Sequence, residues 1–312
     1  MRTKFIKIAL ALILTGCGAT KIPVEVEYAP NLNTTGIKRI AVMPFEGSGN
    51  YALAALSATS QTEKIIGGME NITLVDAAEI NRLQNMGQSI EGKVDALLIG
   101  RITSANYNNE PPSSSSYKDK EGKIHWNTSC RTCTSVGYSY TLMRTKDGSF
   151  MGPISRIGTY CWTNFKNEPP DLFCHSSPDY STAVAKAIFY IPRDLAPYKL
   201  KEERAFAEDK SGDSKIKDRM KKALSQVKEK KYELALDTYL GIYEQFKSVA
   251  AAENASIVYE VLGDTESALK IMQRAFEETN SPDAKPIIER LSEVLENKAK
   301  ITESHKIEVE GK

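Results

Sequence analysis

Histidine and long apolar runs are scarce in this sequence. Only three histidines occur among 312 residues (His125, His175 and His305), so histidine-centred catalysis or metal binding has few candidates. The charge is nearly balanced, with 41 Lys+Arg against 40 Asp+Glu, and lacks the basic excess that nucleic-acid binding requires. No apolar run approaches the ~20 residues of a membrane-spanning helix. The composition, 41% hydrophobic and 26% charged, is that of a globular protein of about two domains.

The first sixteen residues have the layout of a secretory signal peptide. Three basic residues precede the apolar run 8–14, which ends in Leu14-Thr15-Gly16-Cys17. These last four residues resemble the lipobox of bacterial lipoproteins, which implies cleavage before Cys17 and lipid on its thiol and amine. A free cysteine beside an ordinary cleavage site is the plain alternative. Cleavage removes three positive charges and leaves 38 Lys+Arg against 40 Asp+Glu.

The residues after the cleavage site indicate which membrane holds the protein and predict a tether next to the lipid. Gly18, rather than Asp, follows Cys17, which by resemblance to enteric lipoproteins implies the outer membrane, on its periplasmic side. Residues 17–36 contain two prolines and end in Asn33-Thr34-Thr35-Gly36, a pattern typical of irregular chain. We therefore expect a lipidated cysteine and tether over 17–36.

Residues 37–198 alternate between strand-like and helix-like segments. Short apolar runs predict strands at 38–45, 71–75 and 94–102, and segments without Pro or Gly predict helices at 51–66 and 76–86. This β-α-β-α-β order predicts an α/β layer sandwich.

A hairpin and a loop complete this region. Asp147-Gly148 is a turn signal between strands at 136–142 and 154–163. A Ser/Pro-rich segment, 108–125, predicts a surface loop, and 179–190 predicts a helix that ends before Pro192.

Four segments of this region resemble a known family: Lys38 to Phe45, Val75-Asp76, Glu79 to Gly87, and Val94 to Ile102. They are similar to the N-terminal core of the curli-secretion lipoproteins (CsgG-like). The lipoprotein activators of penicillin-binding proteins (LpoB-like) share that core. The resemblance covers roughly half the chain and implies an α+β layer sandwich in a protein of cell-envelope biogenesis. Its motifs are short and apolar, so they specify fold better than function.

Residues 199–312 are predicted to be helical and to form a second domain. Ala235, Tyr239 and Ile242 are followed 33 residues later by Ala268, Met272 and Ala275. This spacing resembles tetratricopeptide repeats, in which the small residues let paired helices approach. Two repeats and a capping helix over 283–300 are expected.

The four cysteines after Cys17 are Cys130, Cys133, Cys161 and Cys174. An even number in an exported protein predicts two disulfides, and four cysteines allow three pairings. A hairpin centred on Asp147-Gly148 places Cys161 opposite Thr134, and a bulge at Gly152-Pro153 would shift it toward Cys133. We favour Cys133–Cys161 with Cys130–Cys174; the main alternative is Cys130–Cys133 with Cys161–Cys174.

Catalytic, metal and cofactor sites are weakly supported. The segment Cys130-Arg131-Thr132-Cys133 has the spacing of a redox dithiol, but it leads into a predicted strand and not into a helix N-terminus, which would lower the thiol pKa. The same cysteines could bind zinc together with His125 and His175, although the sequence contains only one such Cys-x-x-Cys pair. Glu46 to Asn50 follows the first strand, yet it lacks the spacing of a phosphate-binding loop and predicts a turn. We expect no enzyme, no cofactor and no metal.

Two functions remain open from the sequence. The first is a lipid-anchored, non-enzymatic adaptor or activator that binds a protein partner through its helical repeats. The second is a homo-oligomeric ring of a curli-type secretion channel, whose protomers contribute membrane hairpins. The Lys-rich stretch Lys215 to Lys231 is interpreted as a solvated helix face, with contact to anionic lipid as the alternative.

Overall fold

The computed structural model describes residues 20–168 and 177–310 and divides the chain into two compact units. The helical unit comprises the residues up to Tyr28 together with Lys199–Ala299. The α/β unit comprises Ala29–Tyr198, and the residues from Lys300 onward group with it. None of the described helices is long and apolar enough to cross a membrane.

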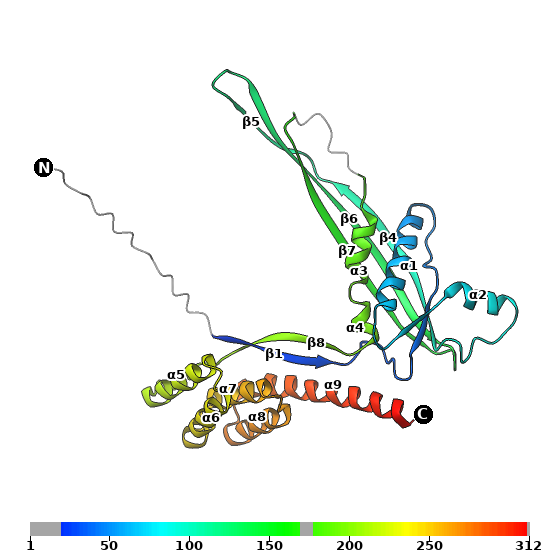
Figure 1. Cartoon of the computed structure of the whole chain (residues 1–312). Helices are drawn as coiled ribbons and strands as arrows, with labels where there is room; N and C mark the ends of the chain where they lie inside the picture. Colours follow the sequence, from blue (N-terminus) through cyan, green and yellow to red (C-terminus); the bar gives the residue numbers. More distant parts are fainter. Residues whose placement is uncertain (1–19, 169–176, 311–312) are drawn as a thin grey trace. The chain divides into compact units, whose positions relative to one another are not determined.

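The elements follow one another in mixed order (Figure 1). The strands are β1 (Lys21–Tyr28), β2 (Arg39–Val42), β3 (Thr73–Val75), β4 (Ala96–Asn109), β5 (Ser113–Lys118), β6 (Ile124–Arg144), β7 (Phe150–Lys166) and β8 (Tyr198–Ala205). The helices are α1 (Ala52–Gly67), α2 (Ala77–Asn85), α3 (Tyr180–Ile188), α4 (Ile191–Leu195), α5 (Ser214–Lys228), α6 (Tyr232–Phe246), α7 (Val249–Val261), α8 (Thr265–Thr279) and α9 (Lys285–Glu310).

The α/β unit is built on one mixed sheet, and the β-α-β-α-β order predicted for residues 38–102 is present as β2, α1, β3, α2 and β4. β2 pairs in parallel with both β3 and β4, and α1 and α2 make the crossovers that parallel strands need. The Asp76 carboxylate accepts a hydrogen bond from the Ala78 N–H (2.8 Å) and begins α2 as expected. β6 then pairs antiparallel with β4, β5 and β7.

Helices cover both faces of this sheet near β2. Ala54, Ala55 and Ala58 of α1 are buried in the same cluster as Tyr138 and Tyr140 of β6, because a stripe of alanines lets a helix approach a sheet closely. α3 packs against α1, β6 and β7 on that side. On the opposite face, Ile80 of α2 covers Ala41 and Leu97. The strands β4, β6 and β7 continue well past these helices (Figure 1).

We name this extension the arm: β5 with residues 105–109 of β4, 124–135 of β6 and 159–166 of β7. The predicted loop at 108–125 is wrong in part, because β5 lies within it and pairs with β6, Ser116 opposite Trp126. The Asp119 carboxylate closes the turn by accepting from the N–H groups of Glu121 (3.0 Å) and Lys123 (2.8 Å). A run of serines carries no apolar alternation, so periodicity gave no strand signal there.

Two further predictions about element boundaries are wrong. Residues 17–36 are not all tether, because β1 lies within them, and the start of the predicted helical region is the strand β8, which pairs with β1. Pro192 does not follow the last helix of the α/β unit but lies in the first turn of the short helix α4, where proline is tolerated.

The helical unit buries the residues that the 33-residue spacing selected. Ala235, Tyr239, Ala268, Met272 and their neighbours Ile242 and Ala275 are all 0% exposed. Successive helices from α5 to α8 pack against one another. The valines Val24 and Val26 of β1 form a separate small cluster with Val261 of α7 and Val294 of α9.

Candidate functional site

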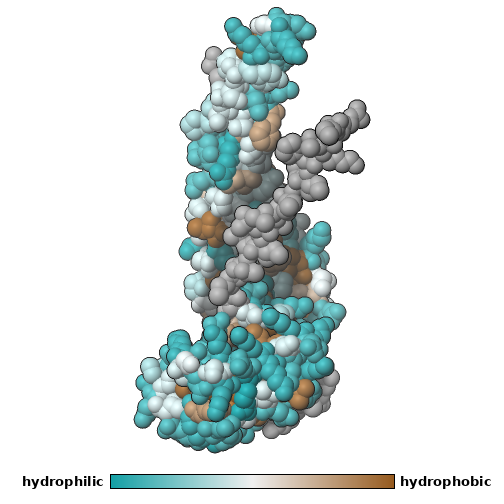
Figure 2. Space-filling model, turned by 90° about the vertical axis from the view of Figure 1, so that its left-hand side faces the viewer, coloured by the Kyte–Doolittle hydropathy of each residue, from teal (hydrophilic) through white to brown (hydrophobic). Residues whose placement is uncertain are grey.

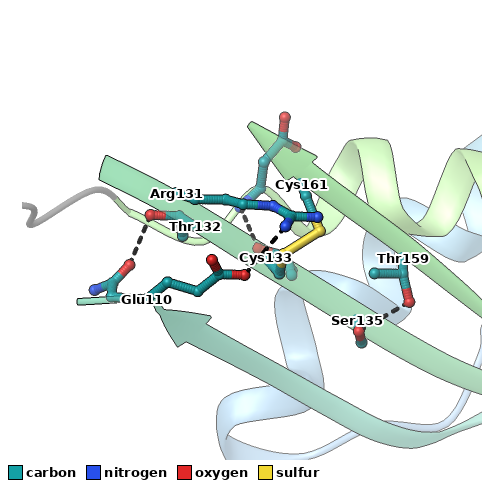
Figure 3. The surroundings of a disulfide bond; sticks show 10 residues. Glu110, Arg131, Thr132, Cys133, Ser135, Thr159 and Cys161 are labelled. Atoms are coloured by element: carbon teal, nitrogen blue, oxygen red, sulfur yellow. Dashed lines mark hydrogen bonds and ion pairs between the residues drawn. A yellow bond between two sulfur atoms is a disulfide. The ribbon is translucent and has the colours of Figure 1, made fainter. Parts of the chain in front are cut away.

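The hairpin of β6 and β7 carries a disulfide between Cys133 and Cys161 (Figure 3). Their Cα atoms are 4.0 Å apart and face each other in the register of the two strands. The favoured Cys133–Cys161 bond is therefore confirmed, and the alternative that joined Cys130 to Cys133 is wrong. Cys130 is buried on β6, while its predicted partner Cys174 and the lipidation site Cys17 lie outside the described residues.

The register that makes this bond differs from the predicted one in two compensating ways. The hairpin closes one residue earlier than expected, with Met143 opposite Phe150. A bulge at Gly152-Pro153 then adds one residue to β7. Without that extra residue, Cys161 would lie opposite Thr132 and could not reach Cys133.

Polar contacts surround the disulfide on the arm (Figure 3). Arg131 pairs with Glu110 at 3.4 Å, and Ser135 and Thr159 share a hydrogen bond of 2.9 Å across the two strands. Thr132 donates to the Asn109 side chain at 2.7 Å on the side of β4. These contacts link β4, β6 and β7. Because Cys133 is bonded to Cys161, no Cys130–Cys133 dithiol is present.

His125 lies apart from the cysteines, near the end of the arm. Its Nε2 is 2.7 Å from an Asp119 carboxylate oxygen, and its ring stacks on Tyr117 with centroids 5.1 Å apart. The hydrogen bond from His125 lowers the pKa of Asp119. In the described part of the chain no three His, Cys, Asp or Glu side chains gather as metal ligands, and His175 lies outside it.

The segment Glu46 to Asn50, expected to be a turn, begins by extending strand pairing. The Glu46 N–H donates to the Gly100 carbonyl, and the Ile102 N–H donates to the Glu46 carbonyl, each at 2.8 Å. Gly100 allows the Phe45 ring to cross the strand, since a Cβ there would lie 2.3 Å from that ring. Glu46 and Gly100 therefore extend the strand pairing and allow Phe45 to pack in the main core of the α/β unit.

A buried ion pair in the α/β unit was not anticipated. The Asp194 side chain at the end of α4 is 0% exposed and accepts from the Arg156 guanidinium, the Tyr140 hydroxyl (2.5 Å) and the Asn31 amide (2.6 Å). Burial raises the pKa of Asp194, but the hydrogen bonds from Arg156, Asn31 and Tyr140 outweigh it, so the net shift is downward. Burial also raises the pKa of Tyr140.

This ion pair has a structural role. It joins three distant segments of sequence, and its carboxylate has no approach from solvent. A polar pair of this kind leaves no periodic signal, because Arg156 and Asp194 are single residues 38 positions apart in the sequence.

The strands β1 and β8 cover one face of the helices α7 and α9. β1 and β8 form a two-stranded ribbon whose ion pairs, Lys21–Glu203 and Lys199–Glu25, run in opposite order along the strands, as in antiparallel pairing. Val24 and Val26 lie on the two helices. This face of α7 and α9 is therefore occupied by β1 and is not accessible to a partner protein.

Two polar contacts fix the ribbon and the chain after it. The Asn254 side chain of α7 accepts from the Ala207 N–H (2.7 Å) and donates to the Ala207 carbonyl (2.9 Å), so it holds one residue of extended backbone at both ends. Glu260 of α7, whose side chain is 2% exposed, accepts two hydrogen bonds from Arg290 of α9 (2.5 and 2.9 Å) and contacts Arg204 of β8. Because Glu260 is buried, its ion pairs with Arg204 and Arg290 favour one position of β8 along α7 and α9.

The arm carries apolar side chains that remain exposed. They are Tyr107, Tyr117, Ile124 and Phe165, between 50% and 73% exposed. Ile157, on β7 just before the arm, is 73% exposed. Brown areas among hydrophilic ones appear along the upper part of Figure 2. The sequence does not predict this surface, because the segment 108–125, which contains Tyr117 and Ile124, has the composition of a loop.

No protein-family model and no curated protein sequence matches this chain. Among solved structures, a PelC variant dodecamer from Paraburkholderia phytofirmans is 14% identical, with a TM-score of 0.31, over 55% of this chain and 98% of that one. A second PelC dodecamer from that organism is 14% identical, with a TM-score of 0.28, over 57% and 98%. The lipoprotein GNA1162 from Neisseria meningitidis is 13% identical, with a TM-score of 0.23, over 42% and 86%. With every TM-score below 0.5, these likenesses carry no argument about fold or function.

Proposed function

We propose that this chain is a lipid-anchored protein of the bacterial cell envelope that acts as a non-enzymatic adaptor or activator for a protein partner. The lipobox-like Leu14-Thr15-Gly16-Cys17 supports the anchor, and the CsgG-like and LpoB-like segments of residues 37–198 support a role in envelope biogenesis. The periplasmic side of the outer membrane is the expected location. The repeat-like spacing of the helical unit fits an interaction protein.

The observation that carries the proposal is the exposed apolar surface on β4, β5, β6 and β7. Exposed aromatic and aliphatic side chains on one surface are typical of protein contact sites, and here the disulfide links the two strands that carry most of this surface. The face of α7 and α9, in contrast, is filled by the ribbon of β1 and β8. We therefore place the partner on the arm, where sequence reasoning had expected the helical repeats.

Site-specific photo-crosslinking in cells tests this placement. A photoreactive phenylalanine analogue replaces Tyr107, Tyr117 or Phe165, one at a time, in the lipidated protein. Leu234 of α6, which is 50% exposed, is the matched control in the helical unit. Crosslinks to another protein from the arm and none from Leu234 support the proposal; heterologous crosslinks from Leu234 alone contradict the placement.

The runner-up is a protomer of a ring-shaped secretion channel with membrane-inserted hairpins. In its favour, β6 has 21 residues and β7 has 17, more than the 9–11 that a membrane strand needs. Against it, the face of the arm that carries Trp126 also carries Lys118 and Lys166, so it is not continuously apolar. The native mass of the lipidated protein in mild detergent decides, since a ring of many protomers would favour the channel and a monomer or dimer would exclude it.

A further inference from the structure

The end of the ribbon that leads toward Cys17 is packed beside α5. The Phe206 N–H, just after β8, donates to the Thr20 carbonyl, just before β1, at 2.9 Å. Phe206 is buried in the same cluster as Ile216 and Met220 of α5, and Ile22 of β1 packs against that cluster. The start of β1 is thus fixed to the core that α5 helps to form.

The chain between this point and the anchor is short. Lys21 follows Cys17 by four positions in the sequence, and an extended chain covers at most ~14 Å over that number. If Cys17 carries lipid, as the proposed function holds, the helical unit is confined to the membrane surface.

α5 presents an unusually basic surface. Seven lysines and Arg219 fall within residues 215–231, against two acidic residues, Asp218 and Glu229. The apolar side of α5 is buried in the unit.

Three of these lysines form a row that faces solvent. Lys217, Lys221 and Lys228 are spaced by four and seven residues, which places them on one side of the helix. All three are exposed, and none makes an ion pair with a described residue, whereas Lys231 pairs with Glu229 at 2.7 Å and Arg219 donates to Gln245 at 2.6 Å. No carboxylate of the described residues therefore occupies the ammonium groups of the row.

We propose that the row of Lys217, Lys221 and Lys228 on α5 binds anionic phospholipid headgroups of the membrane that holds the acyl chains of Cys17. Charge complementarity supplies the attraction, at about fivefold in favour of contact for each lysine near an anionic surface. The short connection from Cys17 to β1 keeps the row at high effective concentration beside the headgroups. The lipid thereby does more than retain the protein, because it also orients the helical unit.

Lysine footprinting of the lipidated full-length protein in vesicles tests the proposal. Vesicles are made either of phosphatidylcholine alone or with 30% phosphatidylglycerol, and acetylation of each lysine is measured by mass spectrometry. We expect Lys217, Lys221 and Lys228 to react at least about fivefold more slowly in the anionic vesicles, and this protection to disappear in 0.5 M NaCl.

Matched charge reversals provide the control. The variant K217E/K221E/K228E should lose the lipid-dependent protection of the neighbouring Lys215 and Lys222. The variant K118E/K123E/K146E changes the same net charge at exposed lysines of the α/β unit and should keep the protection of α5.

Each outcome decides a different point. Equal reactivity of the row in both vesicle types, or protection that salt does not reverse, overturns the headgroup contact while leaving the anchor intact. Failure of the protein to remain on neutral vesicles overturns the lipid anchor, and with it this proposal.

Discussion

Gly158 determines how closely α3 lies on β7. A Cβ at this position would be 2.0 Å from the Ala183 carbonyl oxygen and 2.8 Å from the Ala187 Cβ, both on α3. Because these neighbours belong to a packed helix, Gly158→Ala is expected to lower the free energy of unfolding by about 1–3 kcal/mol. Gly67→Ala is the control, since its Cβ would be 3.6 Å from the nearest atom, on the Leu74 side chain. Urea unfolding of both variants checks the difference; equal midpoints would contradict it.

Asp194 links stability to acidic pH. Its pKa is lowered in the folded protein, so it stabilises the fold above the ordinary pKa of ~3.9, and this contribution is lost as pH falls through the lower folded value. The Asp194→Asn variant should be destabilised by about 3 kcal/mol or more at neutral pH, because the Arg156 charge loses its partner. It should also lose less stability than the wild type between pH 5 and pH 2.

Unfolding measured at several pH values tests the assignment. Asp218→Asn removes an exposed carboxylate on α5 and serves as the control. A wild-type and an Asp194→Asn protein with the same pH dependence would show that this carboxylate is not responsible.

At the scale of elements, the disulfide ties the two longest strands together. The bond between Cys133 and Cys161 closes a chain segment with a sequence separation of 28 residues. The double variant Cys133→Ser/Cys161→Ser should lower the free energy of unfolding by about 2–4 kcal/mol, mainly because the unfolded chain gains freedom. Reductant should shift the melting of the wild type downward, and an unchanged melting temperature would contradict a structural role.

Elements with an apolar period could be predicted, and elements defined by pairing could not. The apolar run around Ile40 predicts a strand, and the alanine-rich segment around Ala55 predicts a helix. The 33-residue spacing of Ala235 and Ala268 likewise predicts the paired helices of the helical unit. β5 has no such mark, because four serines form a strand only when β6 lies beside them. β8 is rich in Lys and Glu, so local propensity favoured a helix, while its partner β1 lies some 170 residues earlier in the sequence.

The candidate site divides in the same way. The Cys133–Cys161 bond follows from hairpin register and so could be predicted, although the turn centre was misplaced by one residue. The Arg156–Asp194 pair and the contact of Asn254 with Ala207 depend on the packing of distant segments, for which single residues give no periodic signal.

At the scale of the whole molecule, the helical unit is discontinuous in sequence. β1 comes from the N-terminal end and β8 from residues 198–205, while the α/β unit is inserted between them. A fragment that begins at Lys199, the boundary that the sequence predicts, therefore lacks β1. We expect this fragment to be unstable, because the surface that Val24 and Val26 cover would be exposed.

Restoring β1 should rescue the fragment. Tyr28 and Tyr198 lie opposite each other at one end of the paired strands β1 and β8, so residues 29–197 can be replaced by an Asn-Gly turn. This chain should unfold cooperatively, as followed by circular dichroism. Cooperative unfolding of the fragment without β1, at the same temperature, would contradict the need for the ribbon.

The insertion also determines how force passes through the protein. From the expected anchor at Cys17, the covalent path enters β1 at Lys21 and leaves it at Tyr28 for the α/β unit. A pull between the membrane and the α/β unit would therefore be carried by the backbone of eight residues, without passing through any of the helices α5 to α8. Because β1 is itself a strand of the helical unit, tension on this path acts directly on the contacts that hold β1 to β8, α7 and α9.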